Sequence, residues 1–261
     1  IPYYFTDKSC SPPEVKITNL PERRARESAV SILRSKDFII QAYVGKAECN
    51  SSQALQFAWY LFKFEVRASG KVQIQETVLL DSRITEWTLQ KRMLDYGQYY
   101  VDVRATYSNQ PSVISSALGF FTISKSQLIA DIAGGNKVTR GKGNPISLDG
   151  SASRDPDVEP GNHASMHFTW LCKKRQEHFP NGSLHSLPVI NNSLGPGSGG
   201  CFGTGVGKLS SNGSIVKLDT SQMTVGEMYD VKLIVTKDNR IDDFIQEIKI
   251  VSGNPPQVTI R

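Results

Sequence analysis

The sequence predicts an all-β protein built from two tandem β-sandwich domains. Short runs of β-prone residues recur with turn residues between them, and almost no segment has the periodicity of an amphipathic helix. The pattern of the first half also returns in the second half, at a spacing of roughly 110–130 residues, which is typical of a repeated domain. Together these observations indicate two copies of one sandwich fold.

The central strand of each copy is the clearest element. Residues 56–62 and residues 167–172 both contain Phe-x-Trp inside a β-prone run. Because side chains on a strand alternate between its two faces, the Phe and the Trp share a face in each copy. We therefore expect Trp59 and Trp170 to lie in the cores of the two domains.

A late strand of each copy follows a glycine-containing turn. Residues 99–105 and 229–235 alternate apolar with other side chains, after turns at Gly97 and Gly226. Residues 94–99 fit a tyrosine corner, in which a Tyr at the start of a late strand hydrogen-bonds back to the preceding turn. This predicts a corner at Tyr99 and a second at Tyr229, which lies one residue further from its glycine.

The polar residues 123–127 mark the predicted boundary between the domains. We expect a first domain over residues 1–123, a second over residues 124–253, and the start of a following domain over residues 254–261. Residues 128–132 are expected to form the opening strand of the second domain. No apolar run approaches the roughly 20 residues of a membrane span, and no signal peptide is recognisable. The chain is therefore expected to be an internal piece of a larger protein.

Cysteines and sequons favour an extracellular environment. The chain has 4 Cys and no C-x-x-C pair of the kind that binds zinc. Four Cys allow three pairings, and the repeat predicts one bridge in each domain, Cys10–Cys49 and Cys172–Cys201. Paired Cys together with several N-x-[ST] sequons are typical of a secreted chain. The sequons begin at Asn50, Asn181, Asn191 and Asn212.

Residues 146–157 are the most specific stretch of the sequence. They read as a strand that enters a tight turn, in which Asp and Ser side chains bond neighbouring backbone N–H groups and Gly150 takes a positive φ. This stretch resembles the signature of the polycystic-kidney-disease (PKD) repeat, an immunoglobulin-like β-sandwich. The strand of Trp170 and the strand that begins at Tyr229 lie where that family places its own central and late strands.

A second resemblance narrows the family. Trp170-Leu171-Cys172, a long polar insert, and then Gly200-Cys201 resemble the receptor-for-egg-jelly (REJ) module of the polycystin-1 family, as do Gly226-x-x-Tyr229 and residues 253–256. The resemblance is strong over residues 128–261. Over residues 1–123 only Phe57-x-Trp59 and the Tyr99 corner match, so the first domain is interpreted as a diverged sister domain, similar to the immunoglobulin and fibronectin III folds.

The resemblance implies a non-enzymatic extracellular segment of a polycystin-1-like membrane receptor, with structural and ligand-recognition roles. Its implied partners are a polycystin-2-type cation channel subunit, extracellular protein or glycan ligands, and the flanking domains of the parent chain. One alternative is a carbohydrate-binding accessory module, although most aromatic residues fall on inward-facing strand positions. The other is a calcium-dependent cell-adhesion ectodomain, although residues 123–127 contain no carboxylate.

Charge and motifs give little support to other functions. The 30 Lys and Arg against 25 Asp and Glu are spread along the chain, which does not favour a nucleic-acid interface. Glycine-rich residues 195–200 lack the strand–turn–helix context of a nucleotide-binding loop. Gly207-Lys208 resembles the end of a phosphate-binding loop, but Phe202 and Leu209 stand where Gly and Ser or Thr are needed, so no catalytic candidate remains. The basic residues 23–26 are interpreted as a solvated basic edge, and the alternatives are a minimal R-x-x-R processing site or a contact for sulfated or acidic glycans.

Two features have more than one interpretation. The carboxylates of Asp149, Asp155 and Asp157 are weak candidates for a calcium site, because hard oxygen ligands suit that ion, and the alternative is that they cap their own turn. The insert at residues 179–213 contains three of the four sequons. With a disulfide closing its base, the insert would serve as a binding surface or, as we favour, as a glycan shield.

Overall fold

The computed structural model describes residues 12–22, 30–45, 55–66, 72–82, 84–108, 110–180, 186–190 and 199–255. The chain divides into two compact units, Ile1–Ser126 and Gln127–Arg261. The described elements are β-strands and short turns, which confirms the predicted all-β class. No helix in the described ranges has the length and apolarity required to cross a membrane.

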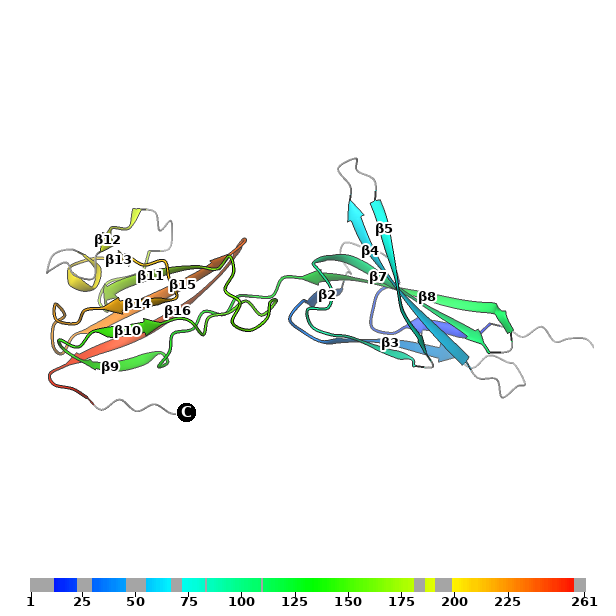
Figure 1. Ribbon diagram of the computed structural model, residues 1–261, viewed down its shortest axis with the longest axis horizontal. Helices are drawn as coiled ribbons and strands as arrows, with labels where there is room; N and C mark the ends of the chain where they lie inside the picture. Colours follow the sequence, from blue (N-terminus) through cyan, green and yellow to red (C-terminus); the bar gives the residue numbers. More distant parts are fainter. Residues whose placement is uncertain are drawn as a thin grey trace, which may run out of the picture. The chain divides into compact units, whose positions relative to one another are not determined.

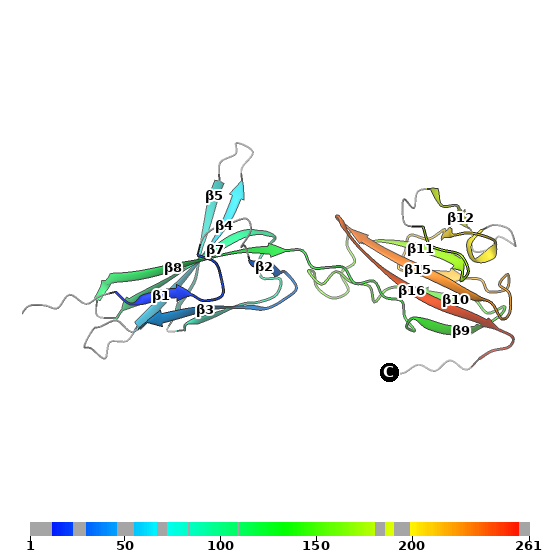
Figure 2. The same ribbon diagram turned by 180° about the vertical axis from the view of Figure 1, so that it is seen from behind.

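The first unit contains two sheets (Figure 1). Seen from behind, β1 lies beside β3 in the smaller sheet, where the two strands pair antiparallel (Figure 2). That sheet has the order β1 (Glu14–Ile17), β3 (Phe38–Gly45), β6 (Glu86–Leu89). The larger sheet has the order β2 (Val30–Leu33), β8 (Gln110–Ser124), β7 (Gly97–Tyr107), β4 (Leu55–Val66), β5 (Val72–Ser82).

The core of the first unit is made by inward-facing side chains of both sheets. Trp59 is fully buried, as the strand pattern predicts, and its indole Nε1 donates a hydrogen bond to the Ile84 carbonyl at 3.2 Å. A buried indole N–H requires such a partner, because leaving it unpaired costs free energy. The cluster also includes Val15, Ile17, Ile40, Trp87, Leu89, Val101, Val103 and Phe121.

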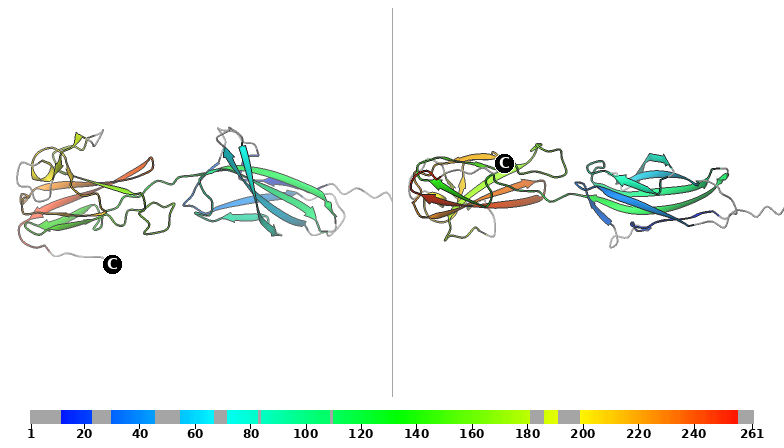
Figure 3. Two further views of the ribbon diagram at one scale, coloured as in Figure 1. Left: turned by 45° about the horizontal axis from the view of Figure 1, so that its top comes forward. Right: turned by 90° about the horizontal axis from the view of Figure 1, so that it is seen from below.

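The second unit, coloured from green to red in Figure 3, also contains two sheets. One sheet pairs β10 (Ile146–Asp149) with β14 (Ile215–Leu218). The other has the order β12 (Val189–Ile190), β13 (Gly207–Leu209), β11 (His167–Lys174), β15 (Met228–Lys237), β16 (Arg240–Val251), β9 (Lys137–Gly141).

The two units share one pairing scheme. In each, the strand that carries the central Trp pairs antiparallel with the late strand, which pairs antiparallel with the last strand. An early strand then pairs parallel with that last strand, β2 with β8 and β9 with β16. This shared connectivity corresponds to the repeat in the sequence. Trp170 is fully buried in the second unit, as Trp59 is in the first.

The expected strand at residues 128–132 is wrong. This segment makes a single bridge, between Ile129 and Arg154, although three of its apolar side chains are buried. Its backbone is bonded by side chains instead of a neighbouring strand: the Asp242 carboxylate accepts from Ala130 N–H, and Ser153 Oγ accepts from the next N–H. The parallel pairing with β16 begins only at Lys137.

Candidate functional site

The insert that follows β11 extends the sheet of the second unit. Part of it forms β12 and β13, and β13 pairs with β11 at the edge of the sheet. A 3-10 turn at Gly200–Phe202 lies between these strands and is buried. The sequence suggested only a polar loop here, because strands of two and three residues among Gly and Ser show no periodicity.

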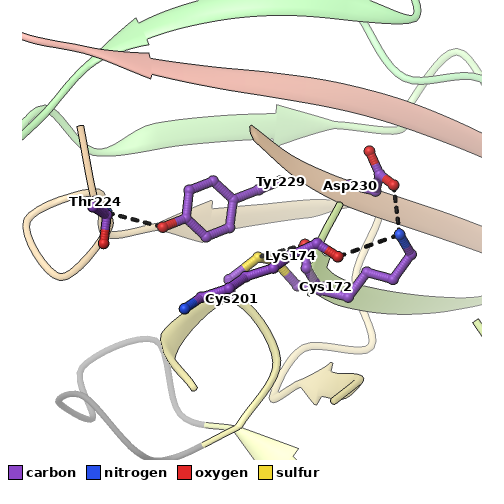
Figure 4. Close-up of a disulfide and its surroundings, with 7 residues drawn as sticks. Cys172, Lys174, Cys201, Thr224, Tyr229 and Asp230 are labelled. Atoms are coloured by element: carbon purple, nitrogen blue, oxygen red, sulfur yellow. Dashed lines mark hydrogen bonds and ion pairs between the residues drawn. A yellow bond between two sulfur atoms is a disulfide. The ribbon is translucent and has the colours of Figure 1, made fainter. Parts of the chain in front are cut away.

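A disulfide joins the base of the insert to the core. Cys172 on β11 is bonded to Cys201 in the 3-10 turn, with a Cα–Cα distance of 5.3 Å, as the repeat predicted (Figure 4). Both residues are buried. The bridge spans a separation of 29 residues. The chain-entropy model assigns a loop of this size about 3–4 kcal/mol of stabilisation. Cys10 and Cys49 lie outside the described residues.

Ile190 packs against the 3-10 turn and the start of β13. Its side chain is 1% exposed and packs where Gly200 and Gly207 have no side chains. A Cβ at Gly200 would lie 2.8 Å from Ile190 Cδ1, and one at Gly207 would lie 2.9 Å from the same atom. The two glycines are therefore required for this close approach. This contact could not be predicted from the sequence, because it depends on three short segments that meet only in the fold.

A buried lysine lies next to the disulfide. Lys173 Nζ contacts the Asp230 carboxylate at 2.5 Å and lies 4.7 Å from the centre of the Phe179 ring. Lys232 reaches the same ring at 5.7 Å and pairs with Asp243. A cation placed over an aromatic ring is stabilised by the electron-rich face of the ring. These contacts fix the first residues of the insert over the outer face of β11 and β15.

Both predicted tyrosine corners are present, with opposite hydrogen-bond directions. Tyr99 Oη donates to the Asp95 carbonyl at 2.9 Å. Tyr229 Oη accepts from the Thr224 N–H at 2.9 Å (Figure 4). In each unit the bond closes the turn that leads into the late strand, which is the role predicted from the sequence.

The turn after β10 has the predicted hydrogen bonds from backbone N–H groups to Asp side chains, but its glycine differs from the prediction. Asp149 Oδ1 accepts from Ser151 N–H at 2.9 Å, and Asp155 Oδ1 accepts from Asp157 N–H at 3.1 Å. The predicted positive φ at Gly150 is wrong, because its φ is not in the left-handed region. Gly150 is needed for space instead: a Cβ there would lie 2.7 Å from Leu233 Cδ2 and 3.1 Å from Trp170 Cζ2.

The three calcium candidates do not form an open site. Arg240 makes a bidentate contact with Asp155, at 2.9 and 2.8 Å, and lies 3.3 Å from Asp157. Lys237 adds a contact of 3.0 Å to Asp155. Burial of the Asp155 carboxyl would by itself raise its pKa, but the hydrogen bonds from Arg240 and Lys237 outweigh burial and lower the pKa to about 2. Protein cations thus occupy the place expected for a metal ion.

Asp149 is separate from this cluster. Hydrogen bonds from Ser151 hold the pKa of the Asp149 carboxyl below its usual range. Within the described ranges no group of three or more His, Cys, Asp or Glu side chains is arranged to hold a metal ion.

One of the four sequons lies in the described part of the chain. Asn212 is exposed in the turn that precedes β14. The other three sequon residues, Asn50, Asn181 and Asn191, lie outside the described residues, as do the basic residues 23–26.

An aromatic row on the outer face of the larger first-unit sheet is a feature that the sequence analysis missed. Phe62, Tyr100 and Phe120 are cross-strand neighbours on β4, β7 and β8. The Phe62 and Tyr100 rings stack at a centroid distance of 4.5 Å with an interplanar angle of 8°. Their faces are therefore directed at each other, which is not the open platform expected of a sugar-binding surface.

Two β-sandwich units with matching connectivity, one of them carrying a disulfide-bonded insert, define a tandem-sandwich protein of the kind found in modular proteins. A family model described as "REJ domain" matches residues 42–261, which is most of the chain and includes parts of both units. The chain belongs to the REJ domain family.

Similar proteins agree with this family. Human polycystin-1 is 23% identical over 255 residues, which cover 97% of this chain and 5% of that protein. Polycystin-1-like protein 1 of Oryzias latipes is 24% identical over 171 residues, covering 65% of this chain and 6% of that protein. The chain therefore spans only about one-twentieth of the length of these relatives.

Among solved structures, the FN1–FN3 domains of chicken CNTN1 align with 93% of this chain and 67% of that chain. The sequence identity is 7% and the TM-score is 0.31.

Proposed function

We propose that this chain is an extracellular, non-enzymatic segment of a polycystin-1-like membrane receptor, with a structural and ligand-recognition role. The observation that carries the proposal is the REJ family match over residues 42–261, which includes parts of both units. The buried disulfide between Cys172 and Cys201 supports it, because such bonds persist in oxidising compartments.

The insert of the second unit is proposed as a glycan shield over one edge of the sheet. It is attached to β11 by the disulfide and by the pairing of β13 with β11, so it is held close to the sandwich. The sequons at Asn181, Asn191 and Asn212 belong to the same insert as β12 and β13, so glycans on them would shield this edge. Such a cover would protect a short sheet edge from pairing with other chains.

The partners are proposed from the family alone. A receptor of this kind would couple to a polycystin-2-type cation channel subunit and bind extracellular protein or glycan ligands. The finer division of the chain, with domains over residues 1–123 and 124–253 and a following domain from residue 254, is likewise a proposal. It differs by three residues from the division at Ser126–Gln127.

Peptide mapping of the secreted chain tests the proposal. The 261-residue chain would be exported from mammalian cells behind an added signal peptide, and its disulfides and glycans would be identified by mass spectrometry without reduction. We expect bridges Cys10–Cys49 and Cys172–Cys201 and glycan on at least one sequon of the insert. The same chain without a signal peptide is the control, with no glycan expected.

An exported chain with free thiols and unmodified sequons would contradict an extracellular role. Retention of the chain in the cell as misfolded material, while the control without a signal peptide folds, would contradict it equally.

A further inference from the structure

The turn before β14 combines a chemically reactive dipeptide with a structural role. Asn212 and Gly213 are both exposed, and together with Ser214 they form a sequon. The Gly213 carbonyl accepts a hydrogen bond from the buried Trp170 indole Nε1 at 3.0 Å. The Ser214 carbonyl accepts one from Gly150 N–H at 2.8 Å. The backbone on the C-terminal side of Asn212 thus anchors two residues of the core.

The Asn-Gly sequence favours attack of the backbone on the Asn side chain. An Asn amide carbon can be attacked by the backbone nitrogen of the following residue, and a side chain on that residue hinders the approach. Glycine has no Cβ and reaches backbone conformations closed to other residues, so it offers the least hindrance. The pair therefore has the least hindered sequence for this reaction.

The local geometry leaves the reacting groups accessible. The Gly213 N–H donates to Ser211 Oγ at 3.3 Å, a long bond at an exposed position that contributes little to holding the nitrogen. A Cβ built on Gly213 would find its nearest atoms 3.7 Å away or more, so the space around this residue is open. The Asn212 side chain makes no hydrogen bond to a described residue and is free to rotate toward the backbone.

We propose that Asn212 is a site of spontaneous deamidation whenever it lacks a glycan. The Gly213 nitrogen loses its proton to water and bonds to Asn212 Cγ. The bond from Cγ to the amide nitrogen breaks, and ammonia leaves. The resulting succinimide takes up one water molecule. Opening at Cγ gives Asp, and opening at the main-chain carbonyl gives isoaspartate, in which the chain continues through the side-chain carbon.

Formation of isoaspartate would strain the core contacts of this turn. The added backbone carbon lies directly before the carbonyls that bond Trp170 and Gly150. If those carbonyls shift, a buried indole N–H loses its acceptor, which is costly. The modified protein would therefore unfold in its second unit at a lower temperature, with increased exposure of Trp170.

A glycan at Asn212 would block the reaction. The sugar is bonded to the same amide nitrogen that must leave as ammonia, and its bulk hinders closure of the ring. This part rests on the proposed function, because only a chain that enters the secretory pathway receives the glycan. The Asn212 side chain can therefore be glycosylated or deamidated, but a glycosylated side chain does not deamidate.

Three secreted chains test the proposal: the unaltered chain, Ser214→Ala, and Ser214→Ala with Gly213→Ala. The first variant removes the sequon and keeps Asn-Gly. The second also replaces the glycine by alanine, for which there is space and no left-handed φ. Each is kept at neutral pH and body temperature, then digested with trypsin. Cleavage after Lys208 and Lys217 isolates residues 209–217 for mass spectrometry.

We expect the Ser214→Ala peptide to gain about 1 Da with time and to split into Asp and isoaspartate forms. The double variant should react several-fold more slowly, and the glycosylated peptide should not react. Equal rates in the two variants would overturn the proposal. A glycosylated Asn212 peptide that deamidates as fast as the Ser214→Ala peptide would overturn protection by the glycan. An unaltered chain that carries no glycan at Asn212 and deamidates like Ser214→Ala would support the labile site but count against the proposed shield.

Discussion

Gly150 shows why a motif glycine can be required for space and not for its backbone angles. Its absent Cβ lets the turn after β10 lie against Leu233 and Trp170 in the core of the second unit. Sequence patterns cannot distinguish this need from that of a left-handed turn, because both select glycine.

Replacement of Gly150 by Ala should destabilise the second unit by about 1–3 kcal/mol, the range for overpacking a tight core. The new Cβ would lie 2.7 Å from Leu233 Cδ2, so neighbouring atoms must move. Urea unfolding measures the loss as a shift of the tryptophan-fluorescence transition to lower urea concentration. Gly213→Ala is the matched control, because its Cβ has space, and a loss equal to that of the control would contradict this explanation.

The Asp155 cluster predicts a dependence of stability on pH. The pKa of the folded state, about 2, lies below the ordinary value of 3.8. The unfolded chain therefore binds more protons between these values, and folding stability falls as pH falls through this window. The contribution is complete above about pH 5 and amounts to about 2 kcal/mol.

The slope of unfolding free energy against pH, measured from pH 5 downward, checks this prediction. Asp155→Asn should be less stable at neutral pH, because Arg240 and Lys237 lose their charged partner, and its slope should be shallower than that of the unaltered chain. An unchanged slope would show that Asp155 does not contribute through its ionisation.

At the scale of elements, the tyrosine corners join each late strand to the turn before it. Tyr99→Phe and Tyr229→Phe each remove one partly buried hydrogen bond to the backbone of the preceding turn. We expect each change to destabilise its own unit by about 1–2 kcal/mol, measured by thermal unfolding.

Tyr107 offers the matched control for these variants. It is 5% exposed, and its hydroxyl is buried with no hydrogen-bond partner in the described part of the chain. Removing that hydroxyl by Tyr107→Phe should leave stability unchanged or raise it, because an unpaired buried polar atom is lost. Equal losses in all three variants would mean that the corners do not stabilise the turns.

At the scale of the whole molecule, the features that could be predicted from sequence are those encoded by neighbouring residues. The Phe-x-Trp strands, the tyrosine corners and the Asp and Ser caps each depend on a few adjacent positions. The pairing of Asp155 with Arg240 could not be predicted, because 85 residues separate them. The strands β12 and β13 were missed because two or three residues cannot show a period.

The expected strand at residues 128–132 fails for a related reason. Buried and less buried side chains do alternate along this segment. Its backbone N–H groups, however, donate to the side chains of Ser153 and Asp242, which come from distant segments. A pattern of apolar residues reports burial and not the identity of the hydrogen-bond partner.

Protease protection of membrane vesicles tests the extracellular assignment most directly. Microsomes would be prepared from cells that make the full-length protein, treated with protease, and probed with an antibody against the 261-residue chain. A tag on a cytosolic segment reports that the protease is active. We predict that the segment survives in intact vesicles and is degraded once detergent opens them. Degradation together with the cytosolic tag in intact vesicles would contradict the account.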